Sequence, residues 1–228
     1  MTSALGWGAL AASSLIVGAL LGLARAWPDR AVGIVLAFGA GALVSAVSFD
    51  LAEEGLHIGS GAAVGAGLAV GALTYFGLNR LVERQASDAG AGPALALGAF
   101  LDGIPEQMVL GIGLATGQGV SVSLLAAIFV SNLPEAIGSS SEMRAAGSRP
   151  ATIRRLWIAV ALVCTLATVA GYAIADNTSG DFKAAINGFA AGALLVMLID
   201  SMIPEAARKA GDVAGLVTVL GFAVATAL

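Results

Sequence analysis

The sequence predicts an all-α, multi-pass membrane protein with eight transmembrane helices in a single domain over residues 1–228. Three observations predict this class: the composition, the length of the uncharged stretches and the distribution of basic residues. Hydrophobic residues make up 58% of the chain and charged residues 11%, with a mean hydropathy of +0.91. Soluble domains are about 45–50% apolar and about 25% charged. Too few charges are present to cover a water-exposed surface, so we expect a lipid environment.

A helix that crosses a bilayer needs about 20 mostly apolar residues. Uncharged stretches cover residues 2–24, 31–49, 58–79 and 156–175, together with the shorter 184–199 and 213–228. The first of the shorter two reaches full length only if it continues into the acidic residues that follow it. Between residues 89 and 141 the only charges are Asp102, Glu106 and Glu135, and a small polar break at 116–121 divides this stretch into the fourth and fifth helices.

The basic residues predict the topology, because cytoplasmic loops collect positive charge. Only Lys183 falls in an even-numbered loop. The odd-numbered loops contain Arg25, Arg30, Arg80, Arg84, Arg144, Arg149, Arg154, Arg155, Arg208 and Lys209. This asymmetry places both termini outside and favours an even number of helices. Trp27 and Trp157 stand beside basic loops, and we expect them to be interfacial anchors.

Glycine pairs four residues apart predict close helix packing. Such small-xxx-small spacings let membrane helices approach each other. They occur at Gly18/Gly22, Gly67/Gly71 and Gly188/Gly192.

The chain also resembles itself at two offsets. At an offset of 151, the residues from Phe38 to Leu43 match those from Phe189 to Leu194 at five of six positions, and Glu54 matches Glu205. At an offset of 29, Phe100, Pro105 and Glu106 match Phe129, Pro134 and Glu135. Both matches pair helices of opposite direction in the predicted topology. We therefore expect inverted repeats in a 3+2+3 arrangement, which is typical of secondary transporters.

Three carboxylates lie near the centres of the fourth and fifth helices. Asp102 and Glu106 share one helix face at a spacing of four residues, and Ser131 and Glu135 repeat this spacing on the other helix. Central charges in a membrane are costly, and every lysine and arginine lies at a predicted helix end or loop. The balancing charge is therefore expected to be a proton or a bound cation. We expect the two faces to form an oxygen-lined site.

Prolines occur beside these acids. Pro105, Pro134 and Pro204 each remove a backbone hydrogen bond and free a carbonyl oxygen inside a helix, which a cavity or a metal site can accommodate.

Two further polar clusters flank the central carboxylates. Asp50 and Glu54 lie in the outer part of the second helix, and Asp200 and Ser201 lie in the inner part of the seventh. We expect these four residues to line the access and release routes. The single cysteine, Cys164, excludes an internal disulfide and is expected to be a small buried residue.

These motifs resemble those of the ZIP (Zrt/Irt-like) family of divalent metal transporters, in a divergent prokaryotic-type form. The family's fourth helix carries a His-Asn-x-Pro-Glu-Gly motif, which 102–107 resembles, and its fifth helix carries a related motif, which 131–135 resembles. The resemblance implies metal-site positions at Asp102, Glu106, Ser131, Asn132 and Glu135. It also implies the inner (plasma) membrane of a prokaryote and is compatible with a homodimer.

The chain departs from the family pattern at several positions, and two of these departures bear on the number of metals. Asp102 stands where histidine is usual, and the predicted sixth helix has no acid to complete a second site. We therefore expect one metal. Carboxylate oxygens suit Mg, Ca or Mn, and Zn also accepts them, so Zn, Mn, Fe and Cd remain open, with Zn favoured by the resemblance.

The preferred hypothesis is a carrier that moves a divalent cation, as substrate, through the central carboxylates by alternating access. We expect no prosthetic cofactor and no nucleic-acid partner, since the net charge of -4 gives no basic patch. The alternative is a proton- or sodium-coupled carrier of a small solute. An intramembrane enzyme is disfavoured because no His pair, Ser/His set or Cys nucleophile accompanies the acids. A packing subunit without transport would leave the central carboxylates unexplained.

Overall fold

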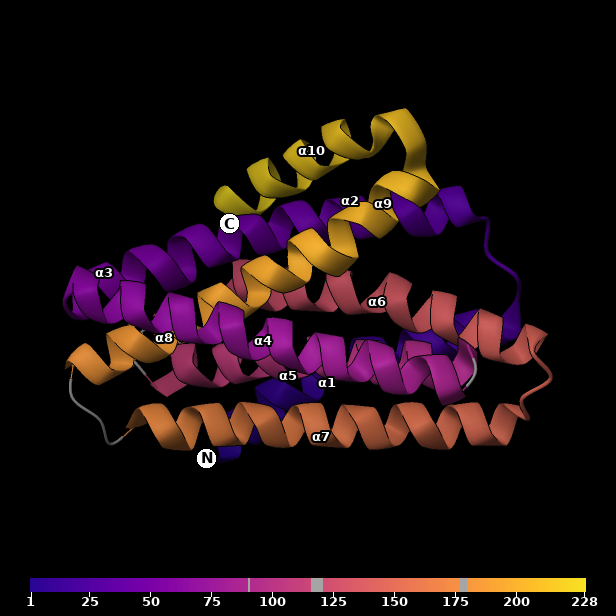
Figure 1. Cartoon of the computed structure of the whole chain (residues 1–228), viewed down its shortest axis with the longest axis horizontal. Helices are drawn as coiled ribbons and strands as arrows, with labels where there is room; N and C mark the ends of the chain where they lie inside the picture. Colours follow the sequence, from indigo (N-terminus) through magenta and orange to yellow (C-terminus); the bar gives the residue numbers. More distant parts are fainter. Residues whose placement is uncertain (90, 116–120, 177–179) are drawn as a thin grey trace.

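The structure is a computed structural model, shown in Figure 1. It describes residues 1–89, 91–115, 121–176 and 180–228. The side chains within these ranges are described apart from those of residues 83, 85–89, 91–99, 101, 102 and 176.

The described part of the chain is almost entirely helical and contains no strand, which confirms the all-α prediction. The α-helices are α1 (Thr2–Ala24), α2 (Asp29–Ala46), α3 (Glu54–Ile58), α4 (Gly61–Ala89), α5 (Ala91–Ala115), α6 (Val122–Ala145), α7 (Pro150–Asp176), α8 (Gly180–Met197), α9 (Ile203–Ala210) and α10 (Ala214–Thr226). Two π-helical segments, η1 (Val47–Glu53) and η2 (Leu198–Met202), continue α2 and α8, and the short 3-10 segment η3 (Gly211–Val213) precedes α10. The long helices lie side by side along the longest axis of the molecule (Figure 1).

Six helical stretches in the described part are long and apolar enough to cross a membrane. The expected seventh and eighth helices fall within one of them, Gly180–Thr226. Inside that stretch the backbone of Gly211 has φ +68°, a value that glycine adopts without steric cost. The chain turns there, and α10 folds back to pack along α2 (Figure 1). A membrane-embedded helical protein is thus supported, while eight crossings stay a prediction.

The ends of the helices follow local sequence signals. The side chain of Ser121 accepts a hydrogen bond from the Leu124 backbone N–H at 3.1 Å and so caps α6. Pro28 precedes α2, Asp29 lies in its first turn, and Pro150 begins α7.

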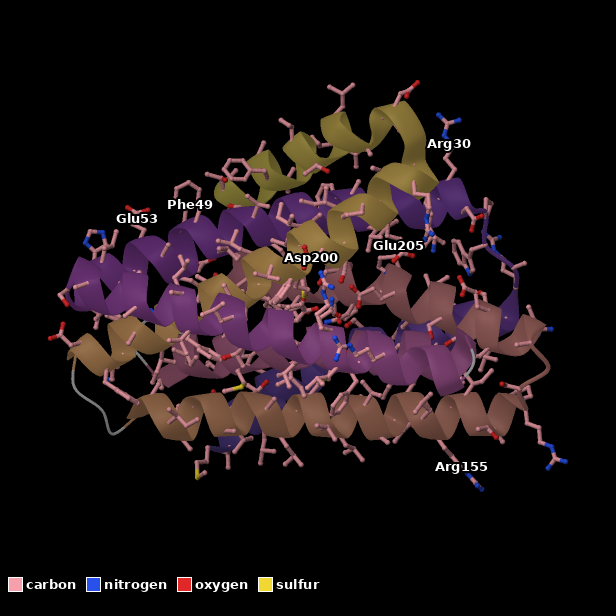
Figure 2. The ribbon with its side chains drawn as sticks, viewed as in Figure 1. Arg30, Phe49, Glu53, Arg155, Asp200 and Glu205 are labelled. Atoms are coloured by element: carbon pink, nitrogen blue, oxygen red, sulfur yellow. The ribbon has the colours of Figure 1, made fainter. Side chains whose placement is uncertain are left out.

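Basic residues from distant parts of the chain lie at one end of the bundle. Arg30 and Arg155 lie at the same end in Figure 2, whereas Glu53 lies at the other. Both chain termini lie toward the Glu53 end in Figure 1. This is the arrangement that an even number of crossings produces, although it does not assign either end to the outside.

The paired glycines lie where helices meet closely, which confirms their predicted packing role. A Cβ atom at Gly67 would lie 2.0 Å from the carbonyl oxygen of Ala185, and one at Gly188 would lie 2.2 Å from that of Val64. A glycine of α4 thus packs against the backbone of α8, and a glycine of α8 packs against the backbone of α4. Gly18 meets α6 in the same way, with a Cβ position 2.6 Å from the carbonyl oxygen of Leu133.

Contacts between helices of the two predicted repeats have counterparts in which the repeats swap roles. The α4–α8 contact has a counterpart in α2–α10, and the α5–α7 contact has one in α1–α6. The segments η1 and η2 begin at Val47 and Leu198, which are 151 residues apart. This separation equals the offset of the sequence repeat.

Trp157 corrects one expectation. Its side chain is fully buried, at 0% exposure, in a cluster with Leu15 of α1 and Ile153 of α7. It is therefore a core residue rather than an interfacial anchor. Trp27 is only partly buried; its indole N–H donates to the carbonyl oxygen of Leu21, and Arg25 stacks on its ring.

Candidate functional site

A buried carboxylate lies at the interface of α5 and α6. Glu106 of α5 is only 1% exposed. The Ser131 hydroxyl donates to its Oε1 at 3.1 Å, and the Asn132 amide donates to its Oε2 at 2.9 Å. Both donors are neutral and come from α6. The structure thus brings together three of the five predicted metal-site residues.

The same two donors are anchored to the backbone of their own helix. The Asn132 amide donates its second N–H to the carbonyl oxygen of Ile128 at 3.0 Å. The same carbonyl oxygen lies 3.0 Å from the Ser131 hydroxyl, whose single proton can go either to it or to Glu106. Behind them, α2 approaches so closely that a Cβ atom at Gly39 would lie 2.9 Å from the Cα of Ser131. The polar face of α6 is therefore held against Glu106 by packing on its opposite side.

Glu135 and Cys164 extend this polar region toward α7. Glu135 is half-buried on α6. Cys164 of α7 is fully buried, as predicted. A Cβ atom at Gly103 would lie 2.8 Å from the Cys164 sulfur, so α5 and α7 are in close contact beside the carboxylates.

Asp102, the remaining predicted residue, belongs to α5, but its side chain lies outside the described residues. Among the described side chains, no group of three or more His, Cys, Asp or Glu residues is close enough to hold a metal ion. The described part of the site therefore offers carboxylate, hydroxyl and amide oxygens in a partly assembled arrangement.

Gln107 and Thr168 form a polar contact that sequence reasoning missed. The Thr168 hydroxyl donates to the Gln107 Oε1 at 2.6 Å, and both side chains are fully buried. The Gln107 Nε2 has no hydrogen-bond partner among the described residues. A glutamine beside Glu106 in an otherwise apolar helix was the available signal, since buried amides need partners.

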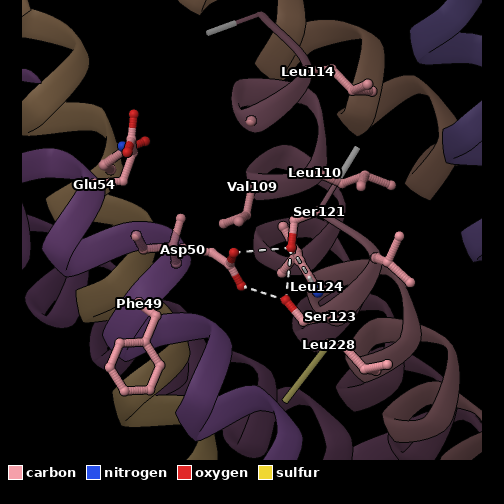
Figure 3. A pocket seen from close by; sticks show the side chains of 14 residues that line it. Phe49, Asp50, Glu54, Val109, Leu110, Leu114, Ser121, Ser123, Leu124 and Leu228 are labelled. Carbon is pink, nitrogen blue, oxygen red and sulfur yellow. Dashed lines mark hydrogen bonds between the residues drawn. The ribbon is translucent and has the colours of Figure 1, made fainter. Parts of the chain in front are cut away.

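The predicted outer residues line a cavity of about 410 Å³ (Figure 3). Asp50 of η1 and Glu54 of α3 both face it. The hydroxyls of Ser121 and Ser123 donate to the two oxygens of Asp50, at 2.9 Å and 3.1 Å. Asp50 and the start of α6 are thus connected, which the sequence did not suggest. Ser121 is the last residue of the polar break that separates the fourth and fifth predicted helices.

Glu53 and His57 do not belong to this cavity. Their side chains are 57% and 71% exposed and form a weak pair at 3.7 Å, four residues apart on one helical face. They behave as a solvated helix surface.

The predicted inner residues lie on η2 and α9. Asp200 is exposed and Ser201 half-buried in η2. Further along, the Lys209 Nζ lies 2.6 Å from the Glu205 Oε1, and the Lys209 side chain is only 11% exposed. Figure 2 shows Asp200 near the middle of the molecule and Glu205 closer to its basic end. The order of these residues along the bundle agrees with the expected route, whose role stays a prediction.

Comparison with known proteins gives one relative of stated function and no family assignment. No protein-family model matches the chain. A curated protein of Arabidopsis thaliana, named a "putative zinc transporter", is 31% identical over 190 residues, which cover 78% of this chain. The chain spans about 30% of the length of that protein.

Proposed function

We propose that the protein carries a divalent metal cation across the membrane, as a ZIP-type transporter, through the carboxylate site between α5 and α6. Metal-ion transport in general is supported by the relative named a zinc transporter. The cargo, the mechanism and the residue roles below are our proposal.

The burial of Glu106 carries this proposal. An ionised carboxylate at the centre of a membrane helix costs on the order of 2.5–3.5 kcal/mol. Two groups that donate to Glu106, a hydroxyl and an amide, are neutral. A divalent cation at this position would supply positive charge, and the neutral donors would hold the carboxylate in place when the cation leaves.

Each residue has a distinct role in this scheme. Glu106 and Glu135 bind the cation as the main ligands, and their two negative charges balance its two positive charges. Asp102 is a third oxygen donor. Ser131 and the carbonyl oxygen of Asn132 are neutral ligands. This oxygen set accepts Zn²⁺ and also suits Mn²⁺.

The cation reaches this site from the Asp50 and Glu54 cavity and leaves past Asp200 and Ser201. Alternating access would then be a relative movement of repeated helix units around the central site. The exchanged helix contacts and the matched positions of η1 and η2 support a 3+2+3 inverted repeat. Eight crossings, both termini outside and the inner membrane of a prokaryotic cell are predictions that accompany this scheme.

The experiment is metal uptake into vesicles containing the purified full chain, with a fluorescent indicator for Zn²⁺ or Mn²⁺ inside. We expect the initial uptake rate of the Glu106→Gln variant to be at least about tenfold lower than that of the parent, because the substitution removes a charged ligand. Glu53→Gln is the matched control, because Glu53 is exposed and outside the site. Equal amounts of protein in the vesicles must be verified for each variant.

Uptake by Glu106→Gln at the parental rate would contradict the proposal. Calorimetric measurement of ion binding distinguishes the metal carrier from the sodium- or proton-coupled carrier of a small solute. A saturable heat of binding for Zn²⁺ or Mn²⁺ supports the metal carrier, whereas a heat for Na⁺ alone supports the alternative.

A further inference from the structure

We infer that the outer cavity is itself a cation-binding site, separate from the central one, in which Asp50, Glu54 and Asn187 bind a partly hydrated divalent cation. This inference rests on the proposed function for the nature of the cargo. It adds a second binding position and a residue, Asn187, that the sequence did not single out.

The cavity has the size and chemistry for such an ion. Its volume of about 410 Å³ holds a cation together with several of its waters. Its polar lining consists of carboxylate, amide and hydroxyl groups, and no lysine or arginine occurs among its described lining residues. Oxygen ligands combined with retained water are typical of Mg²⁺, Ca²⁺ and Mn²⁺ sites.

Asn187 is the observation that points to a ligand. Its side chain is only 2% exposed, and it lines the cavity. No side-chain hydrogen bond joins Asn187 to another described residue, and its amide is not among the enclosed unpaired groups, so it is open to the cavity that it lines. Buried amides are nearly always hydrogen-bonded, to protein or to ordered water. A cation bound by its Oδ1, with water on its amide nitrogen, would satisfy it.

The packing places Asn187 beside the acidic residues. A Cβ atom at Gly55 would lie 3.4 Å from the Cβ of Asn187, so α8 contacts the residue that directly follows Glu54. Asp50 lies four residues before Glu54, at the same cavity. Three oxygen-bearing side chains from η1, α3 and α8 therefore line one space.

The serines complete the site from α6. The hydroxyls of Ser121 and Ser123 donate to both oxygens of Asp50, as the dashed lines in Figure 3 show. A hydroxyl carries lone pairs as well as a proton, so each serine can turn its oxygen toward an arriving cation. The hydrogen bonds thus keep Asp50 in position before the cation binds.

An apolar floor separates this cavity from the central site. Val109 and Leu110 of α5 line the cavity and are 0% and 1% exposed. They follow Glu106 by three and four residues, which is one helical turn. Glu106 itself is not among the cavity's lining residues. The two positions are therefore distinct, and each can be disabled without removing the other's ligands.

The test is equilibrium binding of Mn²⁺ to the purified full chain, followed by electron paramagnetic resonance, which detects free Mn²⁺. In the double variant Glu106→Gln/Glu135→Gln, which disables the central site, we expect about one Mn²⁺ per chain to remain bound. Adding Asp50→Asn should weaken that remaining binding by at least about tenfold. Adding Glu53→Gln instead should leave it unchanged, because Glu53 is 57% exposed and is not a lining residue of the cavity.

A second variant guards against a folding defect in Asp50→Asn. Asn187→Asp adds a negative ligand at the same position and nearly the same size, and should tighten the remaining Mn²⁺ binding. Loss of all binding in the central double variant would overturn the inference, as would remaining binding that neither Asp50→Asn nor Asn187→Asp changes. Failure of the proposed function is a different result, namely retained Mn²⁺ binding without any uptake into vesicles.

Discussion

Asn132 holds the carboxylate of Glu106 from across the α5–α6 interface, with its Nδ2 lying 2.9 Å from Oε2. Because the amide has two N–H groups, it can serve Glu106 and the Ile128 carbonyl at the same time. Replacing Asn132 by leucine should therefore destabilise the protein by about 1.5–3 kcal/mol, the usual value of a hydrogen bond to a charged group. The measurement is unfolding in detergent followed by circular dichroism.

The control for this variant is Thr74→Val. Thr74 is exposed, and its hydroxyl bonds only to the carbonyl oxygen of Val70 in its own helix. We expect a change within about 0.5 kcal/mol. Equal destabilisation by the two variants would contradict the role assigned to Asn132.

Adding a methyl group to α4 should destabilise the protein at Gly67, which contacts α8, but not at Gly65, which does not. A Cβ atom at Gly67 would lie 2.0 Å from the Ala185 carbonyl oxygen, whereas one at Gly65 would meet nothing within 4 Å. Gly67→Ala should cost about 1–3 kcal/mol through overpacking. Gly65→Ala should be neutral or stabilising by up to about 1 kcal/mol, because alanine is the better helix former. Thermal unfolding of the two variants in one detergent compares them directly.

Ser121 and Ser123 both bind Asp50, but only Ser121 also caps α6. Ser121→Ala should therefore lower the stability of the protein by about 1 kcal/mol more than Ser123→Ala. Hydrogen exchange at the first turn of α6 is the sharper measurement, since loss of a cap increases fraying there. Equal exchange rates in both variants would show that the cap contributes nothing.

Lys209 should contribute more to the stability of the protein than its neighbour Arg208, although both pair with Glu205. The Lys209 pair is 2.6 Å long and its side chain is 11% exposed, whereas the Arg208 pair is 4.0 Å long with a side chain 74% exposed. Exposed pairs contribute little. Arg208→Gln should change the stability by less than about 0.5 kcal/mol, and Lys209→Gln should be clearly more destabilising. Chemical unfolding at two salt concentrations tests this, because only the exposed pair is strongly screened.

Local sequence patterns predicted most of the helices and part of the candidate site. The uncharged stretch 2–24 gave α1 at its observed ends, and the stretches 31–49 and 156–175 fall within α2–η1 and α7, since length and composition are local properties. The spacing within each motif and the matching Pro-Glu pairs placed Glu106 opposite the residues of α6. The glycine pairs were equally informative, because four-residue spacing puts both on one helix face.

Contacts between distant segments could not be predicted in this way. Trp157 follows Arg154 and Arg155 closely in sequence, which suggested an interface, but it faces α1 and is buried. Asn187 is one polar residue in an apolar helix, and only the packing of α8 against α3 brings it to the outer cavity. The hydrogen bond between Gln107 and Thr168 joins residues 61 positions apart.

The π-helical form of η1 and η2 bears on how the acidic side chains could be redirected. A π turn contains more residues than an α turn, since its backbone bonds connect i to i+5 rather than i to i+4. If such a segment reverted to α geometry, the residues beyond it would slip by one place, a rotation of about 100° with a rise of about 1.5 Å. Asp50 and Asp200 both lie inside these segments. Each carboxylate is thus positioned where a one-residue slip would turn it to a new direction while the helix stays continuous.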